Sequence, residues 1–203
     1  MRDIIKTKKI QKQFIINFDE TPFYWEHLPR KAICRKIVKT CRGYKKGYYR
    51  ARSTVGLAVS ANGDVLRPLL ILKRKLPYYL RTENKINIMV SNSKNGWINE
   101  DIVIKWLLNV LLPYVQNNIC LLLWDSFEAH ISSTVLSFLK NHPNIIVGTI
   151  VGRTTDFAQP LDLGINKKFK DACKKKALSY TNTTLETMEI INYQQLSKPQ
   201  KHF

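Results

Sequence analysis

The chain has 203 residues, 44% of them hydrophobic, which is enough for one domain with a sizeable core. Its 33 Lys and Arg residues exceed its 15 Asp and Glu residues and give a formal net charge of +18. This imbalance favours a polyanionic partner, with nucleic acid ahead of an anionic membrane surface. The alternative is a basic surface that is merely solvated, but the charge is spread through the chain and not confined to a tail.

Compartment signals point to the inside of the cell. No apolar run approaches the roughly 20 residues of a membrane-spanning helix, so we expect no membrane partner. The charged segment 1–6 lacks the apolar core of a signal peptide. The cysteines form no CxxC pair and have no histidine at zinc-finger spacing; they are Cys34, Cys41, Cys120 and Cys173. We therefore expect a reducing compartment, and the nucleus if the partner is DNA.

The first part of the chain contains one strong strand signal between polar, basic segments. Residues 1–13 are basic and polar, as in the end of a linker. The apolar run 14–18 predicts a first strand that stops at Asp19. Residues 22–52 are rich in Lys, Arg and aromatic residues without clear periodicity, and we interpret them as a loop or an irregular hairpin.

A β-hairpin follows. The apolar runs 54–61 and 66–72 flank Asn62-Gly63, and this combination is the strongest short-range hairpin signal. Pro68 predicts that the second strand is interrupted or lies at an edge, because proline cannot donate to the strand ladder. Residues 86–90 form a further short strand candidate.

The second half of the chain alternates helices and strands. Asn99 is a suitable N-cap for a helix whose apolar residues recur at helical spacing and which we expect Pro113 to close. An unbroken apolar run before Asp125 predicts a central strand buried on both faces. The elements that we expect after Pro113 are a strand at 120–125, a helix from Ser132 or Ser133, a strand at 145–151, and a basic helix from Asp162 to about Tyr180.

This order of elements predicts an α/β protein with a mixed central sheet and flanking helices, and it fits a ribonuclease H-like fold. We expect a basic N-terminal segment at 1–13, one domain at 14–180, and a polar tail at 181–203 that is poorly ordered. The fold alone does not define the function, so the argument depends on the site residues.

Three carboxylates lie at the ends of predicted elements: Asp19 and Asp125 after strands, and Asp162 at the start of the last helix. Carboxylates at the C-terminal ends of strands lie where open α/β sheets bind ligands. Two divalent ions roughly 3.5–4 Å apart can activate a nucleophile and stabilise the leaving oxygen in phosphodiester cleavage. The alternative is that Asp162 caps its helix and Asp19 ends its strand at a turn, and spacing does not decide between the two.

Three neighbours of these acids have structural interpretations that we prefer. Glu20 should point away from Asp19 by strand alternation, which favours a structural role over metal ligation. His130 could approach a metal or a phosphate, but local hydrogen bonds at a helix start are the commoner case. Trp124 should face away from Asp125 and pack in the core.

Basic residues interleaved with aromatic residues could bind DNA through phosphate contacts and stacking. For the segment around residue 48, a solvated loop is an equally good interpretation. The candidate nucleic-acid-binding residues are Lys45, Lys46, Arg50, Arg52, Lys167, Lys168 and Lys170.

Five ordered segments resemble a single known family. They are Asn17-Phe-Asp-Glu-Thr21, residues 54–68, Gly96-Trp-Ile-Asn99 with its helix, residues 121–130, and residues 159–170. Together they resemble the DDE superfamily endonuclease domain of pogo and Tigger transposases, which is also found in centromere protein B and jerky-like proteins. The resemblance implies a ribonuclease H-like core that cuts and rejoins transposon ends with a two-metal site of Mg²⁺ or Mn²⁺. Its acidic triad falls on Asp19, Asp125 and Asp162.

The sequence also departs from this family. Members carry helix-turn-helix domains ahead of the core, and we expect none before Phe14. Two functions therefore stay open: a metal-dependent DNA endonuclease or strand-transfer core, and a domesticated or truncated DNA-binding or chromatin protein without catalysis. The protein partners that we consider are a second copy of the chain, in a homodimer, or a separate DNA-binding protein that supplies the missing recognition domain.

Overall fold

The computed structural model describes residues 1–24, 52–73, 87–150, 159–177 and 179 of the chain. The chain divides into two compact units, Met1–Asn166 and Lys167–Phe203. Most of the basic segment 22–52 lies outside the described residues, as does the polar tail 181–203.

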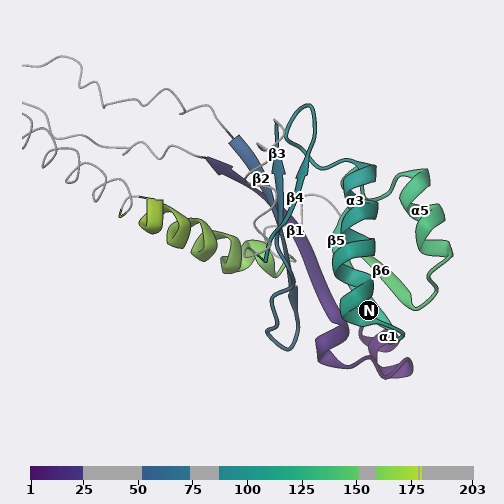
Figure 1. The fold of residues 1–203 in the computed structure, drawn as a ribbon. Coiled ribbons are helices and arrows are strands. Elements are labelled where there is room, and N and C mark those ends of the chain that lie inside the picture. Colours follow the sequence, from purple (N-terminus) through teal and green to yellow (C-terminus); the bar gives the residue numbers. More distant parts are fainter. Residues whose placement is uncertain (25–51, 74–86, 151–158, 178, 180–203) are drawn as a thin grey trace, which may run out of the picture. The chain divides into compact units, whose positions relative to one another are not determined.

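The first unit is built on a mixed six-stranded sheet (Figure 1). Its strands are β1 (Ile15–Tyr24), β2 (Arg52–Ser60), β3 (Leu69–Leu72), β4 (Met89–Asn92), β5 (Cys120–Asp125) and β6 (Ile145–Ile150). They lie in the order β4-β3-β2-β1-β5-β6. The pairs β1–β2 and β2–β3 are antiparallel, whereas β3–β4, β1–β5 and β5–β6 are parallel. The predicted mixed α/β sheet is therefore confirmed.

Strand β1 extends beyond its predicted end. We expected it to stop at Asp19, but its pairing with β2 continues to Tyr24, opposite Arg52. Its pairing with β5 covers Ile15–Asn17, so from Phe18 onward the described β1 pairs with β2 alone. The prediction failed because polar residues such as Asp and Glu are poor strand formers by themselves, and the long antiparallel partner overrides that preference.

The predicted hairpin is present, and its second strand begins late. The turn after β2 contains Gly63 with a φ of 99°, a left-handed conformation that glycine adopts without strain. Strand β3 begins at Leu69, directly after Pro68. The carbonyl of Pro68 accepts a hydrogen bond from the Met89 N–H at 2.8 Å. The expected interruption at Pro68 is thus confirmed.

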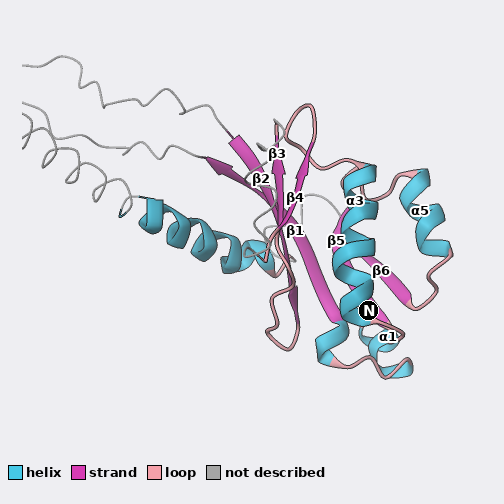
Figure 2. Ribbon diagram, viewed as in Figure 1, coloured by secondary structure: helices cyan, strands magenta, loops and turns pink. Residues whose placement is uncertain are grey.

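Both predicted helix starts are capped as expected. The Asn99 side chain accepts a 3.0 Å hydrogen bond from the Ile102 N–H, and the Ser132 hydroxyl accepts one from the Val135 N–H at 3.3 Å. Figure 2 shows the helices in cyan beside the magenta sheet. The helical elements of the first unit are α1 (Arg2–Thr7), η1 (Lys12–Phe14), α3 (Glu100–Trp106), η2 (Leu107–Leu111), α4 (Leu112–Val115), α5 (Ser133–Lys140) and η3 (Leu161–Ile165).

Pro113 does not close the helix that begins at α3, contrary to the prediction. Helical backbone continues through the π-helical turn η2 into α4 and ends at Val115. Proline has no N–H to donate within a helix, and its ring crowds the carbonyl four residues earlier. The wider π-helical turn directly before Pro113 relieves that crowding, so the helix passes the proline without breaking.

The core lies between the sheet and the adjoining helices α3 and α5 (Figure 1). The ring of Trp106 on α3 lies 4.2 Å from that of Phe18 on β1, measured between centroids. Trp124 and Cys120 on β5 are fully buried, as predicted for a central strand. Within the described residues, no helix is long and apolar enough to cross a membrane.

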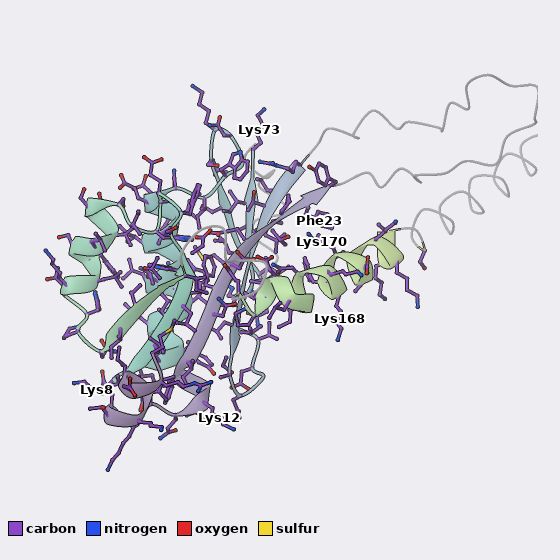
Figure 3. The ribbon with its side chains drawn as sticks, turned by 180° about the vertical axis from the view of Figure 1, so that it is seen from behind. Lys8, Lys12, Phe23, Lys73, Lys168 and Lys170 are labelled. Atoms are coloured by element: carbon purple, nitrogen blue, oxygen red, sulfur yellow. The ribbon has the colours of Figure 1, made fainter. Side chains whose placement is uncertain are left out.

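In the second unit, the described residues 167–177 and 179 are all helical. Two of the three candidate nucleic-acid-binding lysines on this helix, Lys168 and Lys170, are labelled in Figure 3.

Candidate acidic metal site

Strand β1 carries adjacent acids that point to opposite faces of the sheet. Asp19 lies opposite Leu57 of β2, and Glu20 lies opposite Gly56. Because successive side chains of a strand alternate, the two carboxylates meet different partners. Asp19 is 6% exposed, whereas Glu20 is half-buried. The strand therefore supplies one acid to each of two separate hydrogen-bonded groups.

The first group joins Asp19 to Asp162 through Asn166. The Asn166 amide nitrogen donates to Asp19 Oδ2 at 2.6 Å and to Asp162 Oδ1 at 3.0 Å. Asn166 follows Asp162 by four residues, and their side chains are in contact although the backbone at Gly164 between them departs from helical geometry. One buried amide thus links an acid of β1 with an acid of η3.

Two further side chains fix the start of η3 to β1. The Asn17 side-chain oxygen accepts from the Leu161 N–H at 3.1 Å. The Gln159 side-chain nitrogen donates to the Phe18 carbonyl at 3.4 Å. This carbonyl lies where β1 has left β5, and the glutamine supplies the hydrogen bond that a strand would otherwise provide. These two hydrogen bonds, one to the Asn17 side chain and one to the Phe18 carbonyl, hold the start of η3, and with it Asp162, next to β1.

The second group joins Asp125 to Glu20 through His130. His130 Nδ1 lies 2.8 Å from Asp125 Oδ1, and its Nε2 lies 2.9 Å from Glu20 Oε1. Ionised carboxylate oxygens can only accept, so this arrangement favours the imidazolium form, in which both ring nitrogens donate. His130 is 1% exposed and stacks on Trp124, with 4.7 Å between the ring centroids.

We expected His130 to make local hydrogen bonds at a helix start, and this interpretation was incomplete. Its Asp125 contact is local, but Glu20 lies 110 residues away in the sequence. The structural role expected for Glu20 on the opposite side from Asp19 agrees with this contact. Trp124 packs in the core, as predicted. Its stacking on the His130 ring was not predicted.

The electrostatics of the two groups differ. Burial, and then the charge of Asp162, raise the pKa of Asp19 to about 7, although the hydrogen bond from Asn166 opposes the rise. The charges of Glu20 and Asp125 add to it, so Asp125 lies within electrostatic reach of Asp19. Asp19 therefore lies in an environment with uncompensated negative charge.

At His130 and Asp125 the charges compensate each other. Burial alone would lower the pKa of His130, but hydrogen bonds and charge from Asp125 and Glu20 outweigh burial and raise it to about 9. Burial alone would raise the pKa of Asp125, but the hydrogen bond and charge of His130 outweigh it and hold the pKa below its usual value. This group is neutralised internally, whereas the group around Asp19 is not.

The residues present fit a divalent cation. Among the described residues, no Lys or Arg side chain forms an ion pair with the three predicted acids. Asn166 Oδ1 and Gln159 Oε1 are buried oxygens without a described hydrogen-bond partner, and hard divalent ions prefer oxygen ligands. Glu20, Asp125 and His130 also lie close together, with ligand atoms within 4.8 Å of one another, but both His130 ring nitrogens already hydrogen-bond carboxylates, so an ion there would have to displace these bonds.

The structure places the predicted residues as follows. Asp19 and Asp162 meet at one amide, and Asp125 lies at the end of the neighbouring strand β5. Arg52 does not extend freely into solvent: its guanidinium lies 4.0 Å over the ring of Trp97. The remaining candidates Lys45, Lys46 and Arg50 lie outside the described residues, and Lys167, Lys168 and Lys170 belong to the second unit.

Sequence reasoning missed Asn166 and Gln159. The four-residue spacing from Asp162 was a signal for Asn166, since side chains at this spacing are neighbours on a helix. Gln159 had no comparable signal, because its partner is a backbone carbonyl 141 residues away.

Comparison with known proteins finds a matching family model and similar solved structures of a transposase. A family model described as DDE superfamily endonuclease matches residues 50–200, a range that contains Asp125 and Asp162 but not Asp19. Among solved structures, a Mos1 transposase paired-end complex with the left transposon end is 14% identical, with a TM-score of 0.56. The matched region covers 84% of this chain and 44% of the Mos1 chain.

A Mos1 mariner paired-end complex with Mn is 15% identical, with a TM-score of 0.54, and covers 84% of this chain and 46% of that chain. At such identities the likeness shows the fold alone, which is ribonuclease H-like, as the order of elements predicted. The chain spans less than half the length of the Mos1 chains that it matches.

Proposed function

The chain belongs to the DDE superfamily endonuclease family, and from this premise we propose that it is a metal-dependent endonuclease core that cleaves DNA phosphodiester bonds and transfers strands. One observation carries the proposal: Asp19 and Asp162 meet at a single buried amide, and Asp125 ends the strand next to β1. The family implies use of a divalent metal. We propose Mg²⁺ or Mn²⁺ in a two-metal site with Asp19, Asp125 and Asp162 as ligands.

The bound ions would supply Lewis acidity and lower the pKa of an attacking water. The residues of the chain have three tasks. Asp19, Asp125 and Asp162 bind and orient the ions from two neighbouring strands and a helix start. His130 holds the orientation of Asp125 through its 2.8 Å hydrogen bond, while Glu20 fixes the other side of the ring. The buried position of Asp19 keeps its carboxylate away from bulk water.

We further propose DNA as the substrate and partner. One Mos1 structure is described as a paired-end complex with the left transposon end, and two others as a pre-cleavage transpososome and a strand transfer complex. The net charge of +18 supports a polyanionic partner for this chain as well. The candidate contacts are Lys45, Lys46, Arg50, Arg52, Lys167, Lys168 and Lys170.

The finer assignments are also proposals. The segments quoted above favour a pogo or Tigger type of catalytic domain, extending over residues 14–180. A nuclear location follows from a DNA substrate. The proposed protein partner is a second copy of the chain or a separate DNA-binding protein.

The test is nicking of a labelled DNA duplex by the full chain, with Mg²⁺, with Mn²⁺ and with a chelator. We expect metal-dependent nicking that Asp125→Asn abolishes, because the substitution removes a ligand charge while keeping the size of the side chain. Asp101→Asn is the matched control, since Asp101 is an exposed acid in the first turn of α3.

Cleavage that survives Asp125→Asn would refute the metal assignment. DNA binding without nicking, equal in wild type and variant and unaffected by metal, would favour the domesticated DNA-binding protein instead.

A further inference from the structure

Asn166 is a buried polar residue that ordinary core packing does not explain. It is 3% exposed, whereas its neighbour Ile165 is exposed to solvent. Its amide nitrogen donates two hydrogen bonds to carboxylates, one to Asp19 and one to Asp162. Its oxygen Oδ1 is buried without a described hydrogen-bond partner.

Such an arrangement is costly unless it serves a ligand. A buried acceptor without a partner loses its hydration and gains nothing in return. Two like charges drawn to the same amide also repel each other, and one neutral donor group compensates them only in part. An apolar residue at position 166 would avoid the unpaired oxygen but would leave both carboxylates without a donor.

We propose that Asn166 is a positioning residue for the divalent ion held by Asp19 and Asp162. The inference rests on the proposed function and deepens it. Each N–H of the amide fixes one oxygen of a carboxylate, which leaves the second oxygen of each acid available to the ion. Hydrogen-bond partners behind metal ligands orient those ligands and raise the affinity for the metal. The oxygen Oδ1 provides an acceptor for a water of the ion, and Mg²⁺ retains several waters when proteins bind it.

Two other roles for Asn166 make different predictions. If the amide merely occupies the place of the ion, its removal should tighten metal binding, because nothing has to be displaced. If Asn166 only supports the fold, its removal should lower the melting temperature and leave the metal affinity of the folded protein unchanged. The positioning role requires weaker metal binding by a protein that is still folded.

The experiment measures the dissociation constant of Mn²⁺ alone by isothermal titration calorimetry on the full chain. We expect Asn166→Leu to weaken binding by about 10- to 100-fold, the loss typical when a partner of a metal ligand is removed. Asn166→Ser keeps one hydroxyl donor and should fall between Asn166→Leu and wild type. Asn109→Ser is the matched control, because the exposed Asn109 amide contacts the Lys105 carbonyl and neither acid.

Circular dichroism without metal establishes which variants are folded, and Asn166→Ser decides the question if Asn166→Leu does not fold. Equal or tighter Mn²⁺ binding by a folded Asn166 variant would overturn the inference while leaving the proposed function intact. A wild-type chain that binds no Mn²⁺ at millimolar concentration would overturn both.

Discussion

Replacing Asp19 by Asn should stabilise the metal-free protein at neutral and alkaline pH. Asp19 is buried, and its charge is opposed by the charges of Asp162, Glu20 and Asp125. An asparagine is nearly the same size and keeps an oxygen that can accept the hydrogen bond from Asn166. The substitution therefore removes an unfavourable charge with little change in packing, whereas most substitutions of buried residues destabilise.

The magnitude follows from the pKa of Asp19, which is raised from 3.8 to about 7. This is a rise of roughly 3 pH units at about 1.4 kcal/mol each, or about 4 kcal/mol of destabilisation when the carboxyl is fully ionised. Well below pH 3.8 the carboxyl is protonated in the folded and unfolded chains, so it does not affect stability, and its effect is still small at pH 4. Between pH 4 and pH 7 the unfolded chain releases its proton first, and the wild type loses stability as the pH rises.

The assay is urea unfolding of the wild type and Asp19→Asn in chelator at pH 4, 5.5, 7 and 8.5. The stability difference in favour of the variant should grow from near zero at pH 4 to its full size above pH 7. Added Mn²⁺ should stabilise the wild type but not the variant, since only the carboxylate contributes charge to the ion. A variant that is less stable than the wild type at pH 8.5, or a difference independent of pH, would refute the reasoning.

Two further predictions concern the histidine group and the basic surface. His130→Gln should cost about 3 kcal/mol at pH 6, because a pKa raised from 6.5 to about 9 stabilises the fold fully below pH 6.5. That cost should shrink as the pH rises through 9, and a cost that grows with pH in urea unfolding would contradict the imidazolium assignment. Binding of duplex DNA should weaken steeply as salt rises, about tenfold or more between 50 and 200 mM, in a fluorescence anisotropy titration. Salt-independent binding would exclude phosphate contacts by the basic residues.

The sequence predicted the elements whose signals are local. The Asn62-Gly63 hairpin, the Asn99 cap and the Ser132 cap each depend on residues within a few positions, and each is confirmed. The apolar run that precedes Asp125 likewise predicted the central strand β5. These features need no knowledge of distant segments, so a single sequence is sufficient to locate them.

Features that depend on distant partners were predicted less well. The extension of β1 to Tyr24 depends on its pairing with β2. The helix continues past Pro113 through a π-helical turn, which no local sequence pattern predicts. His130 contacts Glu20, and Asn166 contacts Asp19. Asp125 and Asp162 lie at the end of β5 and the start of η3, as predicted, whereas Asp19 lies inside β1. The amide and the imidazole ring that connect these acids to their neighbours could not be predicted.

Strand β1 pairs with β2 over nearly its whole length and with β5 over its first residues only, and this difference affects the order in which the chain folds. Its long antiparallel contact is with the nearby hairpin strand β2, whereas Asn17 meets Leu123 of β5 across 106 residues of sequence. Contacts of such sequence separation carry a large loop-closure cost and form slowly. We therefore expect the β1–β2 pairing to form early and the β1–β5 pairing late. Asp19 and Asp125 would then come together only in the last stage of folding, and partly folded chains would lack the proposed metal site.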